Sequence, residues 1–584
     1  MRLARALLVL ALVLAGVKLV QVQGVEAATL SAQAAGQRTT PQVLPAERGA
    51  ITDRNGSPLA FSVAARALYA QPKRIDQEQR AAHADPEAHK RALAHRVAEV
   101  LGPLVSEQDV LAKLNSDNTT VLLAPLVEPN QARAIKDSFP EVSAEYREVR
   151  QYPGGELAAN VLGVANWRAD ERKVRGLVGL ENSEDTLLAG ADGRRVVDTA
   201  EGSDAVIPGS ERAVRPPVPG SGLELTLDSD LQYTLQQMLG DYARKYHAKG
   251  GSAVVLDAHT AEVYAMANAT TFDPNNLQSV TPEQLANPAV SAPYEPGSVN
   301  KVITAAAAIQ DGIVRPDTVI RVPGQLRVAD RTISDAWSHG VIDLTFTGVL
   351  ARSSNIGTLL TAQRVGPDRF MDMVKRMGLG QPTGVGLPGE SAGRVPPRSQ
   401  WSGSTFANLP IGQGLSMTVL QMAGMYQAIA NDGVRIPPRA IKAQIAPDGT
   451  RTETPRPPGV RVVSPQTAKT VRDMLRAVTQ KAPGQQRGTG SQAALDGYQI
   501  SGKTGTAQQV DPACGCYSDS NYWITFAGIL PADNPRFVVG IMLDDPGTGS
   551  AAPLFHDIAS YLAQRYQIPT SPTPTPYATL TVDH

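Results

Sequence analysis

The first 25 residues are dominated by apolar side chains. Arg2 and Arg5 precede a mostly apolar run over 6–23, which contains a single lysine, Lys18. A membrane-spanning helix needs about 20 such residues, and a lysine near its end can extend to the membrane surface. A cleaved signal peptide needs a shorter apolar stretch followed by small residues, which 25–32 supply. Either interpretation leaves the arginines in the cytoplasm and exports the rest of the chain.

Beyond residue 40 the apolar residues follow the spacing of short strands and helices. Asn55 and Gly56 lie between two apolar-rich runs and favour a tight hairpin, because a type I′ turn requires positive φ at both central residues. Ala, Leu and Val at helical spacing predict a helix over 86–102, which ends in a glycine. A stretch rich in proline and glycine at 215–222 predicts a linker. We therefore expect a mixed α/β domain over 41–220.

The pattern predicts a second domain over 221–567. An Ala-rich apolar run over 301–313 indicates a buried helix with a glycine near its end. Three strand-like runs and a last helix follow much later, at 498–510, 522–531, 536–545 and 554–566. The tail, 568–584, is rich in proline and threonine, a composition that predicts disorder.

The bulk composition limits the class of protein. A chain of 584 residues is too long for one hydrophobic core, and 42% hydrophobic with 19% charged residues indicates globular domains. A net charge of −1 without a large basic run gives no support for a nucleic-acid partner. Two cysteines, Cys514 and Cys516, are too few for a tetrahedral zinc site, and the eight histidines are scattered. We expect no metal.

The octet EPGSVNKV, residues 295–302, places Ser298 three positions before Lys301. On a helix these two side chains share a face. A serine hydroxyl needs an adjacent base to act as a nucleophile, and a lysine can be that base if burial lowers its pKa. The apolar residues that follow would provide the burial, and the first helical turn offers free N–H groups to an oxyanion. The pattern alone is equally compatible with a helix cap followed by an unrelated lysine.

Two further polar segments carry candidate chemistry. Ser353 and Asn355 would project a hydroxyl and an amide together from a loop, although an ordinary polar turn explains them equally well. SGKTGTA, residues 501–507, continues a strand pattern with polar residues and glycines. Because glycine in a strand often marks close approach by a ligand, Gly502 and Gly505 are predicted to clear space for one.

The same strand would present one cation, Lys503, and two hydroxyls, Thr504 and Thr506, which suit a carboxylate and a carbonyl. The alternative is an edge strand with a solvated lysine. Ser-x-x-Lys, Ser-x-Asn and Lys-Thr-Gly follow one another in this order along the chain. The ordered set resembles that of the penicillin-binding and serine β-lactamase superfamily.

Longer segments narrow the resemblance to the class B penicillin-binding proteins. The octet is more similar to their FtsI-type, septal branch than to the elongation branch. The other segments are 48–60, 150–163 and 176–190 in the first domain and 409–423 in the second. The resemblance covers about residues 5 to 565.

The resemblance implies an α+β fold. It comprises a transpeptidase domain with an antiparallel sheet flanked by helices, an N-terminal mixed α/β pedestal domain and a single N-terminal transmembrane helix, which favours the uncleaved anchor. The chain is then divided into a cytoplasmic segment (1–5), the anchor (6–23), a juxtamembrane segment (24–40), the pedestal (41–220), the transpeptidase domain (221–567) and a disordered tail (568–584).

The family resemblance also implies a role for each candidate residue. Ser298 would be the nucleophile and Lys301 its base. Ser353 would relay the proton to the leaving amine, and Lys503 would hold Ser353 electrostatically. Asn355 would orient Lys301 and the substrate amide. Substrate binding would fall to Thr504, Gly505 and Thr506. Backbone N–H groups of Ser298 and Thr506 would form an oxyanion hole. No organic cofactor is implied.

The implied function is D,D-transpeptidation, which cross-links peptidoglycan stem peptides that end in D-Ala-D-Ala at the division septum, with β-lactams as inhibitors. The implied location is the plasma membrane, with a cytoplasmic N-terminus and an extracytoplasmic catalytic domain. Expected partners are a SEDS-type division glycosyltransferase, FtsW-like, and other membrane proteins of the division machinery.

Three alternatives stay open: an elongation-branch transpeptidase, a non-catalytic scaffold, and a D,D-carboxypeptidase or β-lactamase that transfers the acyl group to water. Class A β-lactamases position that water with a glutamate between the second and third motifs. Glu390 is the only glutamate between Asn355 and Glu453, and it lacks their Glu-x-x-Leu-Asn pattern. Fast hydrolysis is therefore not expected.

The two cysteines lie in a segment that would be exported. Export favours a disulfide between Cys514 and Cys516, with Gly515 permitting the tight bend. Two free thiols in a mobile loop are the alternative.

Overall fold

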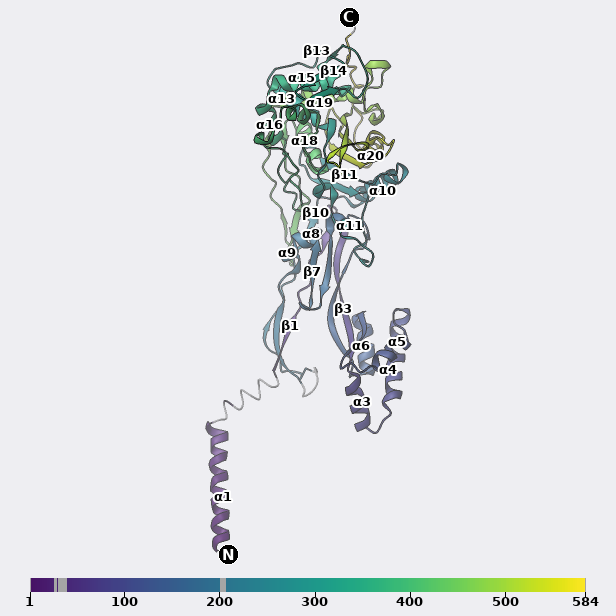
Figure 1. Cartoon of the computed structure of the whole chain (residues 1–584). Helices are drawn as coiled ribbons and strands as arrows, with labels where there is room; N and C mark the ends of the chain where they lie inside the picture. Colours follow the sequence, from purple (N-terminus) through teal and green to yellow (C-terminus); the bar gives the residue numbers. More distant parts are fainter. Residues whose placement is uncertain (1, 26–28, 30–38, 200–205, 583–584) are drawn as a thin grey trace.

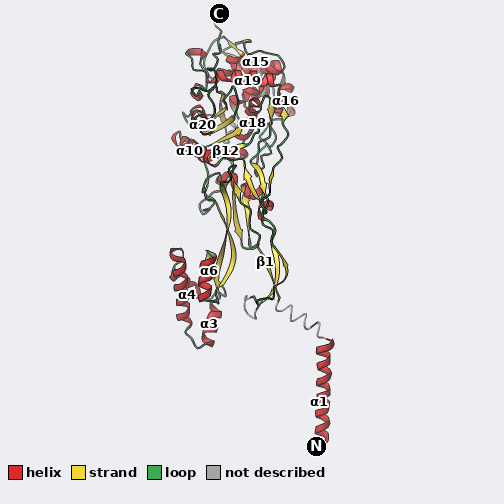
Figure 2. Ribbon diagram, turned by 180° about the vertical axis from the view of Figure 1, so that it is seen from behind, coloured by secondary structure: helices red, strands yellow, loops and turns green. Residues whose placement is uncertain are grey.

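The computed structural model describes residues 2–25, 29, 39–199 and 206–582. From residue 39 onward the molecule is elongated, with long strands in its middle and most helices gathered at the end where the C-terminus lies (Figure 1). Seen from behind, a smaller group of helices from residues 72–138 lies beside the far ends of those strands (Figure 2).

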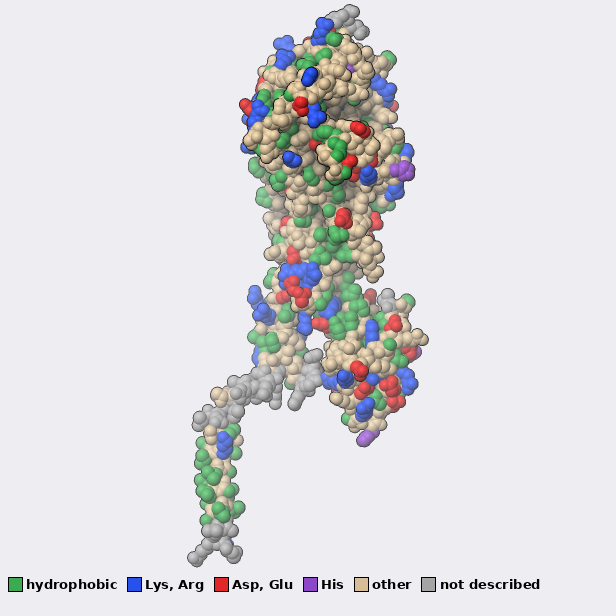
Figure 3. Space-filling model, viewed as in Figure 1, with side chains coloured by type: hydrophobic (Ala, Val, Ile, Leu, Met, Phe, Trp, Pro, Cys, Tyr) green, Lys and Arg blue, Asp and Glu red, His purple; other side chains and the backbone are tan. Residues whose placement is uncertain are grey.

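The N-terminal helix α1 (Arg2–Val20) continues into one π-helical turn (Gln21–Val25). The span Arg5–Gly24 is long and apolar enough to cross a membrane, with a mean hydropathy of 2.1. Its apolar side chains are exposed, as Figure 3 shows along the length of the helix. The predicted apolar run over 6–23 therefore forms a helix of the length expected for an anchor.

The pedestal is built on long antiparallel strands. β3 (Pro58–Ala70) pairs with β2 (Ile51–Thr52), β4 (Val121–Val127) and β5 (Ser143–Gln151). A second sheet has the order β1 (Thr39–Leu44), β8 (Gly193–Asp198), β9 (Arg212–Arg215), and β6 (Val164–Arg168) pairs with β7 (Lys173–Val178). The helices are α3 (Pro72–Ala81), α4 (Pro86–Leu101), α5 (Glu107–Leu114), α6 (Pro129–Ser138), α7 (Ala159–Leu162), α8 (Gly179–Ser183) and α9 (Asp185–Ala189).

Local patterns predicted two pedestal features. The helix predicted over 86–102 is α4, which Asp85 caps by accepting a hydrogen bond from the N–H of Glu87. The predicted hairpin joins β2 to β3. Its turn is not type I′, because Gly56 has a φ of 86° while Asn55 does not have a positive φ. Instead, the Asp53 carboxylate accepts from the N–H groups of Asn55 and Ser57 and closes a longer turn.

The three segments singled out in the pedestal meet at one buried ion network. The Glu181 carboxylate accepts from Arg48 Nε at 2.8 Å and from Arg150 Nε at 2.6 Å, and all three side chains are at most 1% exposed. Tyr152 donates its hydroxyl to the same carboxylate, and Arg48 also pairs with Asp185 at 2.7 Å. Residues far apart in the sequence are thus joined by charge, which explains why these segments carry arginine and glutamate in a domain core.

The predicted linker over 215–222 is instead part of the packed structure. Gly220 N–H donates to Glu47 O at 2.8 Å, and Ser221 N–H donates to Leu187 O at 3.0 Å. A Cβ on Gly220 would lie 1.7 Å from Leu188 O, so glycine here allows close packing rather than flexibility. The next strand, β10 (Gly222–Leu225), pairs with β2 of the pedestal and with β18 (Ile441–Ile445) of the second domain. One sheet therefore crosses the boundary predicted at 220/221.

The second domain is centred on a five-stranded antiparallel sheet in the order β12-β11-β23-β22-β21. Its strands are β11 (Gly250–Asp257), β12 (Val263–Asn268), β21 (Ser501–Asp511), β22 (Cys516–Leu530) and β23 (Phe537–Asp544). Val255 of β11 packs with α10 (Ser229–Lys245) and α20 (Ala551–Arg565) on one face. Its neighbour Val254 packs on the other face with α13 (Lys301–Gln310) and α18 (Val419–Ala430). Alternation along the strand thus separates two cores.

The second domain contains further short elements. The helices are α11 (Pro282–Leu285), α12 (Pro288–Ser291), α14 (Phe346–Ala351), α15 (Asn355–Val365), α16 (Pro367–Arg376), α17 (Thr405–Asn408) and α19 (Pro465–Leu475). The short strands are β13 (Val319–Val322), β14 (Gln325–Val328), β15 (Arg331–Ser334), β16 (Ile342–Thr345), β17 (Val434–Arg435), β19 (Arg451–Glu453) and β20 (Val460–Arg461).

The prediction of a disordered tail over 568–584 is wrong for its described part, which ends at residue 582. Ser571 donates its hydroxyl to Asp533 at 2.7 Å, and Leu580 is fully buried. Low hydrophobicity predicted disorder, but backbone groups of the segment are paired by residues far away in the sequence, and composition does not reveal such pairing.

Candidate active site

The turn that carries Ser298 is a single 3-10 turn, Gly297–Asn300, which runs directly into α13. Residues three apart eclipse one another in this geometry, so Ser298 and Lys301 lie on one side of the chain. Ser298 is partly exposed, whereas Lys301 is fully buried. The expected nucleophile therefore faces solvent while its expected base lies in the core.

Glycines let other segments approach this turn closely. A Cβ on Gly412 would lie 2.0 Å from Gly297 O, and a Cβ on Gly505 would lie 2.0 Å from the Thr525 hydroxyl and 2.8 Å from Pro296 O. A Cβ on Gly502 would meet the Phe526 ring at 2.5 Å. The prediction that Gly502 and Gly505 clear space for a ligand is therefore wrong, because the chain itself occupies that space.

Asn300, between the serine and the lysine, is fully buried. Its Nδ2 donates to Leu409 O at 2.8 Å, and its Oδ1 has no hydrogen-bond partner within the described part of the chain. Asn300 thus ties the serine turn to the segment around Gly412, whose O accepts from Gly297 N–H at 3.1 Å. This contact explains why a polar residue occupies a buried position in the octet.

The ammonium of Lys301 contacts both residues of the second motif. Nζ donates to Asn355 Oδ1 at 2.7 Å, to Ser353 O at 2.5 Å and to Ser353 Oγ at 3.2 Å. Burial lowers the pKa of Lys301 from 10.5 to about 7, although the negative charge of Asp335 opposes the shift. Near neutral pH a large fraction of this lysine is an uncharged amine, which is able to accept a proton.

Lys503, on β21, contacts the same hydroxyl. Its Nζ donates to Ser353 Oγ at 3.0 Å and to Thr504 O at 3.0 Å. Burial and then the nearby charge of Lys301 hold the pKa of Lys503 well below its ordinary value. Ser353 Oγ thus lies between two buried lysines, in a position to pass a proton from one group to another.

Ser353 has a φ of 60°, a conformation that a serine adopts at a cost and that is typical of functional turns.

Asp335, which the sequence did not single out, holds the residues that follow Ser353. Its carboxylate accepts from Ser354 Oγ at 2.7 Å and from the N–H groups of Asn355 at 2.6 Å and Ile356 at 3.0 Å. A carboxylate at the N-terminus of α15 also offsets the helix dipole. No local pattern around Asp335 signals this role, since its partners lie about 20 residues away.

Thr504 and Thr506 lie on one face of β21, where Thr504 is partly exposed and Thr506 is exposed. Thr489, a second residue missed by sequence patterns, shares a hydrogen bond of 2.8 Å with the Thr504 hydroxyl. The exposed hydroxyls lie on the strand that also carries Lys503, which gives this edge the donors that a carboxylate requires.

Beyond Thr506 the β21–β22 hairpin extends past the site. A disulfide joins Cys514 and Cys516 at its tip, in agreement with the alternative that the sequence favoured. The neighbouring Tyr517 donates its hydroxyl to Glu295 at 3.0 Å, and Glu295 also accepts from Gly414 N–H at 3.1 Å. Glu295 therefore links the serine turn to the hairpin.

The glutamate considered as a possible activator of water is already engaged in its own loop. Glu390 accepts hydrogen bonds from Thr383 N–H at 2.6 Å, from the Thr383 hydroxyl, and from Gly384 N–H at 3.1 Å. A carboxylate that holds a loop in this way is poorly suited to act as a base for hydrolysis.

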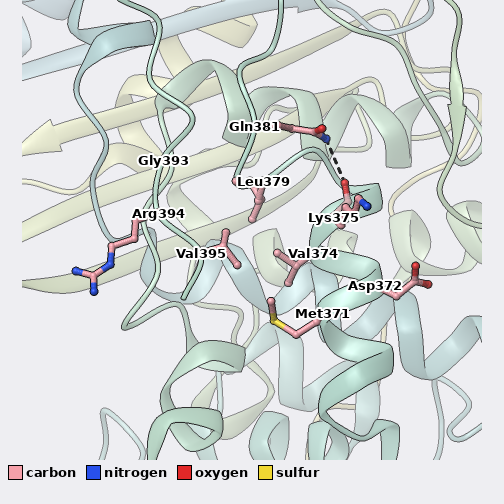
Figure 4. A pocket seen from close by; sticks show the side chains of 10 residues that line it. Met371, Asp372, Val374, Lys375, Leu379, Gln381, Gly393, Arg394 and Val395 are labelled. Atoms are coloured by element: carbon pink, nitrogen blue, oxygen red, sulfur yellow. Dashed lines mark hydrogen bonds between the residues drawn. The ribbon is translucent and has the colours of Figure 1, made fainter. Parts of the chain in front are cut away.

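A separate cavity of about 650 Å³ runs along α16 (Figure 4). Its lining consists of Met371, Asp372, Val374, Lys375, Leu379, Gly380, Gln381, Gly393, Arg394 and Val395. None of these is a predicted site residue. The chemistry is therefore assigned to the meeting point of the serine turn, the α14–α15 junction and β21.

Comparison with known proteins agrees with the fold and the site. Residues 251–560 match the family model of the penicillin-binding protein transpeptidase domain, and residues 43–225 match that of the penicillin-binding protein dimerisation domain. Together these matches and the three motifs define a two-domain penicillin-binding protein.

Individual relatives narrow the class. Penicillin-binding protein PbpB of Mycobacterium tuberculosis is 55% identical, over 98% of this chain and 86% of the relative. Peptidoglycan D,D-transpeptidase FtsI of Escherichia coli is 32% identical, over 88% of this chain and 83% of the relative. A crystal structure of penicillin-binding protein 3 from M. tuberculosis, complexed with ampicillin, is similar at a TM-score of 0.74 and 49% identity, over 93% of this chain and all of that one. The chain belongs to the class B penicillin-binding proteins of the FtsI type.

Proposed function

We propose that this protein is a membrane-anchored, serine-type D,D-transpeptidase that cross-links peptidoglycan during cell division. The observation that carries the proposal is the state of Lys301. This lysine is buried, has a pKa near 7, lies one 3-10 turn from Ser298 and donates hydrogen bonds to Ser353 and Asn355. Such a lysine is suited to take a proton from a serine that has no histidine partner among the described residues.

The geometry supports a defined sequence of steps. Lys301 accepts the proton of Ser298 as Oγ attacks the penultimate D-Ala carbonyl of a donor stem peptide. Backbone N–H groups of Ser298 and Thr506 stabilise the oxyanion, and the loss of one such donor typically costs about 3–4 kcal/mol. The C–N bond to the terminal D-Ala then breaks, and the leaving amine receives the proton that Lys301 took up, through the Ser353 hydroxyl. The result is an ester between Ser298 and the donor.

The second half of the reaction transfers this acyl group. An amine of a neighbouring strand attacks the ester, its proton returns to the Ser298 oxygen, and an amide cross-link forms. Thr504 and Thr506 hold the terminal carboxylate of the donor, and Lys503 holds the Ser353 hydroxyl beside them by its hydrogen bond. Asn355 orients both Lys301 and the substrate amide. β-Lactams, which resemble the donor terminus, acylate Ser298 by the same first step.

The cellular setting is part of the proposal. The apolar helix α1 anchors the protein in the plasma membrane, with a short cytoplasmic N-terminus and the catalytic domain outside. Its site of action is the division septum, beside a SEDS-type, FtsW-like glycosyltransferase. Depletion in the native cell tests this setting: filaments without septa are expected, whereas swollen, rounded cells would assign it to elongation.

The reaction itself is tested with purified protein, a stem-peptide donor that ends in D-Ala-D-Ala, and an acceptor amine. We expect release of D-Ala together with a cross-linked product. Ser298→Ala should abolish both, while Ser291→Ala, a nearby partly buried serine, should leave both unchanged. Release of D-Ala with only the hydrolysed donor would instead indicate a carboxypeptidase, and an active Ser298→Ala protein would overturn the nucleophile.

A further inference from the structure

The segment 569–582, which we name the C-terminal brace, crosses the transpeptidase domain and reaches the active-site motifs from behind. It begins after α20, where Ser571 N–H donates to Gly497 O and Gln499 N–H donates to the Ser571 hydroxyl, both at 2.9 Å. The prolines of the brace favour an extended backbone and reduce the freedom that ordering removes. The segment can therefore be ordered by a modest number of contacts.

The end of the brace pairs with the chain immediately before α14. Thr345 N–H donates to Leu580 O at 3.1 Å, and the Thr345 hydroxyl donates to Thr579 O at 2.7 Å. A Cβ on Gly348 would lie 1.9 Å from Leu580 O. Helix α14 thus has a glycine where the brace crosses it, and any other residue would push the two apart.

The side chain of Leu580 lies directly behind the Ser353 motif. It is fully buried against Ala351, the last residue of α14, and against Ala477. The carbonyl of Ala351 accepts from Thr489 N–H at 3.0 Å, and the Thr489 hydroxyl is bonded to that of Thr504. Leu580 therefore supports a short chain of contacts that ends at both Ser353 and the strand that carries Thr504.

Two glutamines attach the brace to the segment that carries Thr489. Gln480 accepts from Ala578 N–H at 2.8 Å and donates to Ala578 O at 3.0 Å. Gln486 accepts from Leu580 N–H at 2.7 Å and donates to Thr581 O at 3.0 Å. Each amide side chain satisfies a backbone donor and a backbone acceptor, as a neighbouring strand would.

We propose that the C-terminal brace positions the active site, with Leu580 and Gln486 as positioning residues for Ser353 and Thr504. This inference rests on the proposed acyl transfer. Ser353 must lie within hydrogen-bond distance of Lys301 and Lys503 at once, in a strained backbone conformation, and the brace fixes the end of α14 two residues before it. Displacement of a catalytic group by about 1 Å can lower a rate by about 100-fold.

The test compares variants of the full chain in stopped-flow acylation by a fluorescent penicillin. Below the unfolding midpoint of each variant, Leu580→Ala should lower the limiting acylation rate constant by about tenfold or more and change the dissociation constant of the pre-covalent complex less than about twofold. Leu580→Met, which preserves volume, should restore the rate to within about threefold. Ser571→Ala removes a brace contact far from α14 and should match the wild type.

Several results would overturn the inference. One is a folded Leu580→Ala protein that acylates at the wild-type rate, and another is a Ser571→Ala protein that is slowed equally, because that pattern reports general destabilisation. Should Leu580→Ala not fold, Gln486→Ala takes its place with the same expected rates. Absence of acylation in the wild-type protein would instead contradict the proposed function. Failure of the proposed function and failure of the inference about the brace thus give different results.

Discussion

The pedestal and the transpeptidase domain both bury cations, but these cations have different partners. In the pedestal, the guanidinium groups of Arg48 and Arg150 both face the Glu181 carboxylate. In the transpeptidase domain, the amino groups of Lys301 and Lys503 face hydroxyl, amide and carbonyl oxygens. Burial lowers the pKa of Arg48, but the charges and hydrogen bonds of Glu181 and Asp185 outweigh it and raise the pKa. No such ion pair reaches the two lysines in the described residues, and their pKa values fall.

The partner of a buried cation therefore distinguishes a structural role from a chemical one within this molecule. A buried cation with a carboxylate partner stays charged and holds segments together. A buried cation with neutral partners is poised to lose its proton, at a cost in stability that the surrounding core must offset. The first arrangement links three pedestal segments, and the second leaves Lys301 suited to the role of base that we propose for it.

Replacement of Lys301 should give the largest effect. Lys301→Met removes the base but preserves the apolar stem, so acylation by penicillin should slow by about 10²- to 10⁴-fold while the unfolding temperature does not fall. Lys375→Met, at an exposed position of α16, is the matched control and should change neither quantity. A slow and destabilised Lys301→Met protein would contradict the comparison, because it would make the lysine structural.

Replacement of Glu181 should give the reverse pattern. Glu181→Gln leaves Arg150 buried without a charge partner among the described residues and leaves Arg48 paired with Asp185 alone, so it should lower the free energy of unfolding of the pedestal by about 3–5 kcal/mol in urea titration. Acylation per folded molecule should be unchanged. Glu171→Gln breaks an exposed ion pair with Arg175 and should cost no more than about 1 kcal/mol. Equal losses in the two variants would refute the structural importance of the network.

The pH dependence of acylation sharpens the contrast. The proposed base is the uncharged amine of Lys301, so the rate should rise with pH through about 7 and then level off. Asp335→Asn removes the charge that raises the pKa of Lys301, so the midpoint should move to lower pH. A midpoint that stays in place, or moves upward, would exclude Lys301 as the titrating base.

The lowered pKa of Lys301 also makes the stability of the fold depend on pH. Between pH of about 7 and 10.5 the unfolded state binds more protons at this lysine than the folded state does. The contribution of Lys301 to stability is therefore least favourable below pH 7 and improves as the pH rises toward 10.5.

The smallest expected effect concerns the hairpin beyond the site. Tyr517→Phe removes the hydroxyl that donates to Glu295, beside the serine turn. A hydrogen bond from an uncharged phenol to a partly exposed carboxylate should change the acylation rate by about 2- to 10-fold, measured by stopped flow. A loss of several hundredfold would mean that the hairpin belongs to the catalytic apparatus itself.

Sequence patterns predicted the parts of the site that depend on neighbouring residues. Ser298 and Lys301 share one turn, and the apolar run after them predicted the burial that lowers the pKa of Lys301. Local spacing also indicated that Ser353 and Asn355 act together. The order of motifs then pointed to their meeting in space.

Residues whose partners lie far away in the sequence were missed or misinterpreted. Asp335 and Thr489 contact the motifs across the fold, so no local spacing marks them. Gly505 was predicted to leave room for a ligand, because the sequence does not show that Pro296 approaches this glycine. Leu580 was predicted to lie in a disordered tail. Its burial depends on α14, over 200 residues earlier, and composition does not reveal this contact. Tertiary contacts decide each of these cases.

The central claim, that Ser298 is a nucleophile activated by Lys301, is tested most directly by locating the covalent adduct. Intact-mass measurement after incubation with benzylpenicillin should show one added penicillin per chain, and peptide mapping should place it on Ser298. The adduct should be absent in Ser298→Ala and should form only slowly in Lys301→Met. An adduct at another residue, or one that persists in Ser298→Ala, would contradict the account.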